Sequence, residues 1–363
     1  MNDDKQKLTK ILSMKEMNAA VLEDYGNFKW KSIPVPQLAE NEVLVKVGYA
    51  GICGSDQHIY KGEFHPRTSV PFIPGHEFAG TIVEIGSKSK RFSVGTQVAV
   101  DPIIWCGKCP ACLQEHYPAC TSLKLVGVDM NGGFGEFINI PENMLYEVDP
   151  RIPLKHAALV EVLSIGFHAC NRAKVKEGDT VAIWGAGKVG QCILQALRTK
   201  TKNTVVLVDI LNKRLELAKK YYKDIYIINA EKEDAVERIK EITDNKGVDI
   251  AFEAIGHFHN IPNRENPVKA CIQSIRGAGT VCVLGLGDDP VDVLMKELIW
   301  KEAVIITSRV SHGEFAETIK HLEIGDLKPD ALITDILKPQ QIQEAFKMLE
   351  KEPENHLKIL LEF

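Results

Sequence analysis

Four cysteines on one short loop constrain this chain more than any other feature. Cys106, Cys109, Cys112 and Cys120 follow a C-x2-C-x2-C-x7-C spacing within fifteen residues. Four thiolates on a single Pro- and Gly-punctuated loop can close a tetrahedral shell around Zn²⁺ without an open position, which is typical of a structural zinc site. A bacterial ferredoxin cluster is the nearest alternative, but its run has three residues before the fourth cysteine, whereas this chain has seven. The loop 101–122 is therefore predicted to hold structural zinc.

The composition narrows the class of protein. The chain has 363 residues, is 45% hydrophobic and 26% charged, and carries a formal net charge of −5. These values favour a globular protein of two or three domains and give no reason to expect binding to nucleic acid or a membrane surface. No apolar stretch reaches the length of a transmembrane helix. Because no secretory signal is recognisable, we expect a reducing, cytoplasmic compartment and no disulfide framework.

The pattern of predicted secondary structure changes near residue 163. Residues 1–16 are polar and charged and are predicted to form a loosely ordered extension. Residues 17–163 hold short β-type runs between Gly- and Pro-rich turns, which predicts a mostly β domain. Residues 164–307 alternate strand and helix, as a doubly wound parallel sheet does. The tail 308–363 has a helical segment and a closing strand, and we expect it to return to the first domain. The predicted fold class is α/β.

A glycine-rich turn lies within the alternating region. Gly185-x-Gly187-x-x-Gly190 directly follows an apolar run and opens a predicted helix whose first turn contains Lys188 and Val189. Glycines at these positions allow a tight turn and a close approach to a pyrophosphate, which the helix N-terminus would bind. The alternative is that the glycines serve only close packing of the helix on the sheet. The strand, turn and helix together favour a dinucleotide site.

Two residues bear on which dinucleotide would bind. Asp209 ends the next predicted strand, 19 residues after Gly190, where a carboxylate would bind ribose hydroxyls. Its negative charge would repel a 2′-phosphate, so the sequence favours NAD over NADP. Arg214 keeps NADP open, since an arginine near this position can accommodate that phosphate.

A second metal site is predicted in the β domain. Cys53 and His76 offer a thiolate and an imidazole, and Glu77 and Glu161 are candidate oxygen ligands. Three protein ligands and an open position are what catalytic zinc requires. Each residue alone would more often be a buried structural side chain, but they occur here beside a four-cysteine loop and a dinucleotide turn. Their combination favours a catalytic site.

These motifs resemble the zinc-dependent medium-chain alcohol dehydrogenases from about Met17 to the C-terminus. The resemblance is carried by Gly51-Ile-Cys-Gly-Ser-Asp-x-His58, Gly75-His-Glu77, Val160-Glu-x-Leu-Ser164, the cysteine loop and the glycine turn. The sorbitol and threonine dehydrogenase branch is the nearest, because Glu161 stands where the simple alcohol dehydrogenases have cysteine. The resemblance implies a GroES-like catalytic domain, a Rossmann coenzyme domain, and a homodimer or homotetramer.

The resemblance also implies roles for individual residues. Cys53, His76 and Glu77 would be zinc ligands, and Glu161 would bind the zinc directly or hold its water. Ser55 would lie against the zinc-bound oxygen, Asp56 would orient a ligand, and His58 would be the outer end of a proton relay. Arg309 resembles the position at which sorbitol dehydrogenases direct an arginine toward substrate hydroxyls.

The expected activity is therefore interconversion of a secondary alcohol of a polyol or sugar with its ketone, by hydride transfer between substrate and NAD(H). Glu161 and Arg309 favour hydroxyl-rich substrates, while threonine, another hydroxy amino acid and a simple alcohol remain alternatives. An alternative of another class is a zinc-stabilised NAD(P)H-binding protein without turnover, because a fold does not fix a function. That alternative does not need Cys53, Ser55 and His76 together.

Overall fold

The computed structural model describes residues 14–256, 266–287 and 290–363, which divide into two compact units. The first unit contains the chain up to Glu161 together with Ile333–Phe363, and the second contains Val162–Leu332. Most of the expected extension, residues 1–13, lies outside the described residues, and β1 begins at Glu16. No helix of the described ranges combines the length and apolar character needed to cross a bilayer.

The first unit is built on a mostly antiparallel sheet with the order β16-β17-β3-β4-β5-β9, to which β8 adds by pairing with β3. In its register, Gly51 on β3 lies between Leu360 on β17 and Glu77 on β4. This register brings the end of β3, the start of β4 and β17 side by side. The strands are β3 (Glu42–Gly51), β4 (Glu77–Ile85), β5 (Gln97–Val100), β8 (Phe137–Pro141), β9 (Leu145–Glu147), β16 (Ile333–Leu337) and β17 (Lys358–Glu362).

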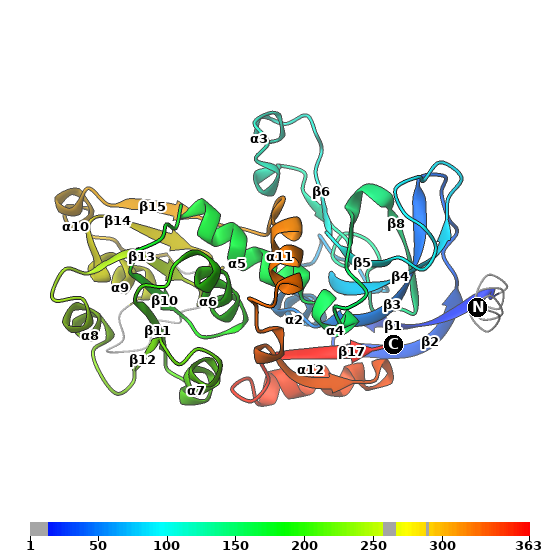
Figure 1. The fold of residues 1–363 in the computed structure, drawn as a ribbon. Coiled ribbons are helices and arrows are strands. Elements are labelled where there is room, and N and C mark those ends of the chain that lie inside the picture. The colour runs from blue at the N-terminus through cyan, green and yellow to red at the C-terminus, as the bar shows by residue number, and fades with distance from the viewer. Residues whose placement is uncertain (1–13, 257–265, 288–289) are drawn as a thin grey trace. The chain divides into compact units, whose positions relative to one another are not determined.

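Smaller elements complete this unit. A β1–β2 hairpin and a short β6–β7 pair are antiparallel, and the loop between β6 and β7 extends from the sheet in Figure 1 and carries α3. Helix α12 packs on β2. The bounds are β1 (Glu16–Asp24), β2 (Asn27–Pro34), β6 (Ile103–Ile104), β7 (Lys124–Leu125), α2 (Gly54–Tyr60), α3 (Pro110–Leu113), α4 (Leu154–Ala157) and α12 (Ile342–Lys351).

The second unit contains a six-stranded parallel sheet with the order β12-β11-β10-β13-β14-β15. Numbered from β10, this is the 3-2-1-4-5-6 order of a Rossmann fold, so the predicted doubly wound sheet is confirmed. The central strands are apolar and buried because helices cover the sheet (Figure 1). The strands are β10 (Val181–Trp184), β11 (Val205–Asp209), β12 (Tyr226–Asn229), β13 (Val248–Glu253), β14 (Ile275–Val283) and β15 (Val304–Thr307).

The helices of the second unit follow the alternation expected from the sequence. Helices α8 and α9 supply Val236, Ile239 and Cys271 to a buried cluster that includes Val206 and Ala251 of the sheet. Asp234 caps α8 by accepting hydrogen bonds from the N–H groups of the first turn. The helices are α5 (Val160–Arg172), α6 (Lys188–Lys200), α7 (Asn212–Tyr221), α8 (Ala235–Ile242), α9 (Pro267–Ser274), α10 (Met295–Lys301) and α11 (Glu314–Glu323).

The chain returns to the first unit later than the sequence boundary at 307/308. Residues 308–332 group with the second unit because α11 packs on α5. Ser164 and Thr318 exchange a buried hydroxyl hydrogen bond of 3.0 Å, and Nδ1 of His168 lies 3.0 Å from Oε1 of Glu314. Helix α5 begins at Val160, so it spans the division between Glu161 and Val162, two residues before the boundary predicted from the sequence.

Candidate zinc and dinucleotide sites

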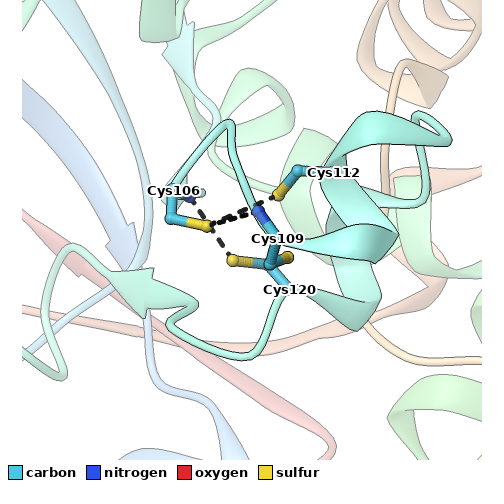
Figure 2. Close-up of side chains that lie close together, drawn as sticks. All are labelled: Cys106, Cys109, Cys112 and Cys120. Carbon is cyan, nitrogen blue, oxygen red and sulfur yellow. Dashed lines mark hydrogen bonds between the residues drawn. The ribbon is translucent and has the colours of Figure 1, made fainter.

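The four cysteines of the β6–β7 loop converge, as Figure 2 shows. Their four sulfur atoms lie within 4.8 Å of one another, and the sulfurs of Cys106 and Cys112 are 3.9 Å apart. Pro110 begins α3 directly after Cys109, so a turn of helix places Cys112 back toward the other sulfurs. The geometry matches a set of four ligands around one ion.

Backbone N–H groups surround these sulfurs. The N–H of Cys109 donates to the sulfur of Cys106, and those of Cys106 and Ser122 donate to the sulfur of Cys120, each at 3.4 Å. Hydrogen bonds from the backbone at Cys112 and Thr121 lower the pKa of Cys109 to about 6. Burial instead raises the pKa of Cys112 to about 12, so the loop stabilises thiolates at Cys106 and Cys109 but not at Cys112. Stabilised thiolates at two of the four positions fit a metal ion better than neutral thiols do.

A second group of ligand atoms lies where β3 leads into α2. Cys53 is the N-cap of α2, His76 directly precedes β4, and Glu77 is the first residue of β4. Their ligand atoms lie within 4.8 Å of one another. Because β3 and β4 pair with Gly51 opposite Glu77, the sheet register holds these segments together. One thiolate, one imidazole and one carboxylate are a donor set suited to zinc.

Asp56 lies behind this group and is fully buried. Its Oδ2 accepts a 2.8 Å hydrogen bond from the N–H of Cys53, and its Oδ1 lies 3.6 Å from Nδ1 of His76. Among the described residues, Oδ1 of Asp56 and Nδ1 of His76 have no hydrogen-bond partner. A small movement of either side chain would bring them into hydrogen-bond distance of each other. A carboxylate at this place fixes the orientation of the imidazole.

Ser55 and His58 lie on the same short helix. The hydroxyl of Ser55 is 3.4 Å from Nε2 of His76. Nδ1 of His58 contacts Oε2 of Glu63, and its side chain is about one third exposed. Ser55 therefore lies beside the candidate ligand His76, while His58 lies nearer to solvent on the same helix.

Burial and neighbouring charges shift the pKa values of Cys53 and Glu161 at this site. Burial and the charge of Glu77 would raise the pKa of Cys53, but the charge and hydrogen bond of His76 outweigh them and lower it. Burial raises the pKa of Glu161 to about 8, against the opposing charge of His76. Glu161, in the first turn of α5, does not belong to the group within 4.8 Å. Its Oε2 is buried and has no hydrogen-bond partner in the described residues. A cation nearby would offset the free-energy cost of burying the ionised carboxylate.

The sequence did not reveal a further member of this site, Lys358. Its side chain is completely buried on β17 and forms an ion pair with Oε2 of Glu77. The sequence signal is a single lysine inside the apolar run Leu357–Leu361. A lysine in such a run is normally expected to point to the exposed side of the strand. The pairing depends on strands 281 residues apart in the chain.

The glycine turn of the second unit has the tight geometry expected of it. Gly185 has a φ of +105°, and a Cβ there would lie 2.9 Å from the carbonyl oxygen of Ala254. A Cβ on Gly190 would lie only 1.8 Å from the carbonyl oxygen of Gly185. Gly187 is the N-cap of α6, followed by Lys188 and Val189, and a Cβ on it would meet nothing closer than Nη1 of Arg214 at 3.7 Å. The helix N-terminus is therefore open at Gly187.

Two carboxylates at the carboxyl ends of the strands hold the loops of this region. Asp209 accepts hydrogen bonds from the N–H groups of Ala186 at 2.6 Å and Leu211 at 2.8 Å. Glu253, which the sequence analysis missed, accepts from Ile255 and Gly256, and from Gly285 across the β13–β14 edge. Like Asp209, it is an acid at the end of a buried strand, and that pattern could have identified it. Both lie beside the β10–β13 switch point, where doubly wound sheets bind ligands.

Arg309 lies in the segment between β15 and α11 and is exposed. The next residue, Val310, has a φ of +47°, which is unusual for a β-branched residue. Arg309 belongs to the second unit, whereas Cys53, His76 and Glu77 belong to the first.

Comparison with known proteins identifies relatives over nearly the whole chain. Residues 39–150 match the alcohol dehydrogenase GroES-like domain family, and residues 189–323 match the zinc-binding dehydrogenase family. The chain is 33% identical to a sorbitol dehydrogenase of Bacillus subtilis over 337 residues, which cover 91% of this chain and 93% of the relative.

Two of the solved structures that share the fold contain a bound dinucleotide. A protein described as a short chain alcohol dehydrogenase from Escherichia coli CFT073, complexed with NADH, is 29% identical with a TM-score of 0.88 and covers 96% of this chain and 100% of its own. A zinc-binding dehydrogenase from Sinorhizobium meliloti 1021, bound to NADP, is 26% identical with a TM-score of 0.87 and the same coverage of both chains.

Proposed function

Because this chain belongs to the zinc-dependent medium-chain alcohol dehydrogenase family, whose members act on CH–OH groups, we propose that it interconverts a secondary alcohol of a polyol or sugar with the ketone, using NAD(H). The observation that carries the proposal is the presence in one chain of the Cys53, His76 and Glu77 group and of the glycine turn with Asp209. A binding protein without turnover would need only the second of these.

In this proposal Cys53, His76 and Glu77 hold the catalytic zinc, and the four-cysteine loop holds a structural one. Bound zinc would supply Lewis acidity that lowers the pKa of a substrate hydroxyl. Asp56 keeps His76 in its ligating orientation. Glu161, buried beside the group, binds the metal directly or holds water there, and it can replace Glu77 as the oxygen ligand.

Ser55 and His58 are proposed to move the substrate proton. Ser55 lies 3.4 Å from His76, so its hydroxyl is placed to accept a proton from a substrate oxygen at the metal group. His58 receives the proton on the solvent side of α2, where its Nδ1 contacts Oε2 of Glu63. A bound nicotinamide would supply the hydride acceptor, and the proton would leave to solvent through His58.

NAD is the proposed cofactor. Gly185, Gly187 and Gly190, with the first turn of α6 at Lys188 and Val189, would bind the pyrophosphate. Asp209 would accept hydrogen bonds from the ribose hydroxyls and repel a 2′-phosphate. Arg214 lies beside Gly187, which supports contact with the adenosine end of the cofactor.

A polyol or sugar is the proposed substrate class. The similarity to a sorbitol dehydrogenase supports it, as do Glu161 and Arg309, which would offer polar partners to several hydroxyl groups. Threonine or another hydroxy amino acid and a simple alcohol are the competing substrates.

We also propose that the chain is a cytoplasmic homodimer or homotetramer. Its nine cysteines form no disulfide, which suits a reducing compartment. Strand β15 is the edge of the parallel sheet, and Ile299, Trp300, Val304 and Ile305 leave an exposed apolar surface on it and on α10. A surface of this kind is typical of subunit contacts.

The test is reduction of NAD, and separately of NADP, by the zinc-loaded protein with polyols, sugars, threonine and simple alcohols. We expect activity with NAD on a polyol or sugar, and loss of that activity when zinc is removed. NAD binding without reduction of NAD by any member of the panel would favour the non-catalytic alternative. A preference for threonine or a simple alcohol would reject the substrate class while leaving the reaction type intact.

A further inference from the structure

Asn229 is a buried polar residue at the end of β12, and its amide group makes three hydrogen bonds. Its Nδ2 donates to the carbonyl oxygen of Ile210 at 3.1 Å and to Oδ1 of Asn212 at 2.6 Å. Its Oδ1 accepts from the N–H of Glu231 at 2.8 Å. Ile210 and Asn212 lie in the turn from β11 into α7. One side chain on β12 therefore fastens the turn that follows Asp209.

Asp209 holds the other side of the same peptide group. The carbonyl of Ile210 and the N–H of Leu211 belong to one planar peptide unit and point in opposite directions. The carbonyl oxygen accepts from Asn229, and the N–H donates to Oδ1 of Asp209 at 2.8 Å. The two side chains therefore fix the rotation of this peptide from opposite ends.

The register of the parallel sheet brings Asn229 and Asp209 to this peptide. Strands β11 and β12 are neighbours, and the two residues are partners at the carboxyl ends of these strands. The N–H of Ala230 continues the pairing by donating to the carbonyl oxygen of Asp209 at 3.0 Å. Because doubly wound sheets bind their ligands beyond this edge, the clamped peptide borders the proposed position of the ribose hydroxyls.

The rotation of this peptide decides which groups can face a cofactor. In the observed rotation the N–H of Leu211 is turned to Asp209, and together with the N–H of Ala186 at 2.6 Å it holds both carboxylate oxygens. A carboxylate oxygen can accept more than one hydrogen bond, so both oxygens can still accept from ribose hydroxyls. A peptide free to rotate would release an N–H group that can donate to a phosphate, and it would loosen the carboxylate that repels one.

We propose that Asn229 is a positioning residue that makes the site selective for NAD over NADP, by locking the Ile210–Leu211 peptide with its N–H turned to Asp209. The inference rests on the proposed function, since it takes the glycine turn and Asp209 as the dinucleotide site. Loss of the lock lowers the affinity for NADH, because Asp209 is held less firmly. The affinity for NADPH falls less, because its phosphate gains an N–H donor near the first turn of α7, which contains Lys213 and Arg214.

The experiment is a fluorescence titration of the full-length, zinc-loaded protein with NADH and, separately, with NADPH. In Asn229→Ala the amide donor is gone, so we expect the ratio of the NADPH to the NADH dissociation constant to fall about tenfold, the effect of about one hydrogen bond. Equal weakening of both dinucleotides would overturn the proposal, since an asparagine that only stabilises the turn affects both alike. The titration contains no substrate, so its outcome does not depend on turnover.

Asn203→Ala is the matched control. Asn203 also ties two loops of this sheet, since its amide donates to the carbonyl oxygen of Gly178 and to Oγ1 of Thr180. It precedes β11, however, and so lies at the edge of the sheet opposite to the ligand edge. Its replacement should lower the free energy of unfolding in urea and leave the ratio of the two dissociation constants unchanged. An equal change of that ratio in both variants would reject a specific role for Asn229.

A second variant gives the test another route. Asn212→Ala removes an exposed side chain that accepts from Nδ2 of Asn229 and leaves the buried amide in place. The amide then orients the peptide less firmly, so the ratio should fall about threefold. If Asn229→Ala does not fold, this variant decides the question, and an unchanged ratio would reject the proposal. A wild type that binds neither dinucleotide would instead reject the proposed cofactor site itself.

Discussion

Replacing Gly190 by alanine should damage the dinucleotide turn through one identifiable collision. A Cβ at this position would lie 1.8 Å from the carbonyl oxygen of Gly185, whereas real Cβ contacts are not closer than 3.0 Å. The turn after β10 and helix α6 must therefore separate by the difference, 1.2 Å. The obstructing atom belongs to the backbone, so it cannot move away by a side-chain rotation. Overpacking of this kind costs about 1–3 kcal/mol. We expect Gly190→Ala to lower the free energy of unfolding by that amount and to weaken NADH binding.

Two other glycines of the same unit provide matched controls. A Cβ on Gly187 would have no contact closer than 3.7 Å, so Gly187→Ala should fold with normal stability but obstruct the approach of a pyrophosphate. A Cβ on Gly277 would meet nothing within 4 Å, so Gly277→Ala should change neither property appreciably. Urea unfolding and titration of NADH fluorescence measure the two effects separately. Normal stability of Gly190→Ala would refute the packing argument, and normal NADH affinity of Gly187→Ala would refute the cofactor site.

Three further results are expected. Cys109→Ser should reduce the zinc content by the structural ion and lower the melting temperature, while Cys53 still binds its ion; unchanged zinc content by atomic absorption would contradict the structural site. Burial would raise the pKa of Glu314, but the hydrogen bond and charge of His168 lower it, so its stabilisation exists above the ordinary value of 4.5 and disappears as the pH falls through the folded pKa. Glu314→Gln should therefore cost about 1.5–3 kcal/mol at neutral pH and less in acid, and a pH-independent difference in urea unfolding would be inconsistent with this. Burial raises the pKa of Glu161 to about 8, so the metal-free folded protein binds a proton that the unfolded chain releases above 4.5, and its stability falls as the pH rises between those values. Glu161→Gln should flatten that decline in thermal unfolding of the stripped protein, and an unchanged slope would argue against burial as its cause.

The features that could be predicted from the sequence are those that depend on residues close together in the chain. Gly185, Gly187 and Gly190 lie between a strand and a helix, and Asp209 ends the following strand, so local rules were enough to place them. The Rossmann sheet was likewise predictable from alternating strands and helices. The four cysteines are close in sequence, and a single loop had to bring them together.

The features that the sequence missed depend on contacts between distant segments. The burial of Lys358 follows from the order β17-β3-β4 and from the lack of a side chain at Gly51, neither of which is visible in the local pattern around residue 358. The placement of residues 308–332 in the second unit depends on α11 meeting α5 through His168 and Glu314. The roles of Ser55, His58 and Arg309 rest on chemistry with a substrate and remain predictions.

The role of the catalytic zinc is tested by the rate of NADH formation by Cys53→Ser on the polyol or sugar that the wild type oxidises fastest. We expect a folded protein that keeps the zinc of its four-cysteine loop and its affinity for NADH, yet has lost turnover, because the ligand set of Cys53, His76 and Glu77 is incomplete. Substantial turnover by this variant after dialysis against a chelator would contradict the claim that zinc at these residues carries the reaction.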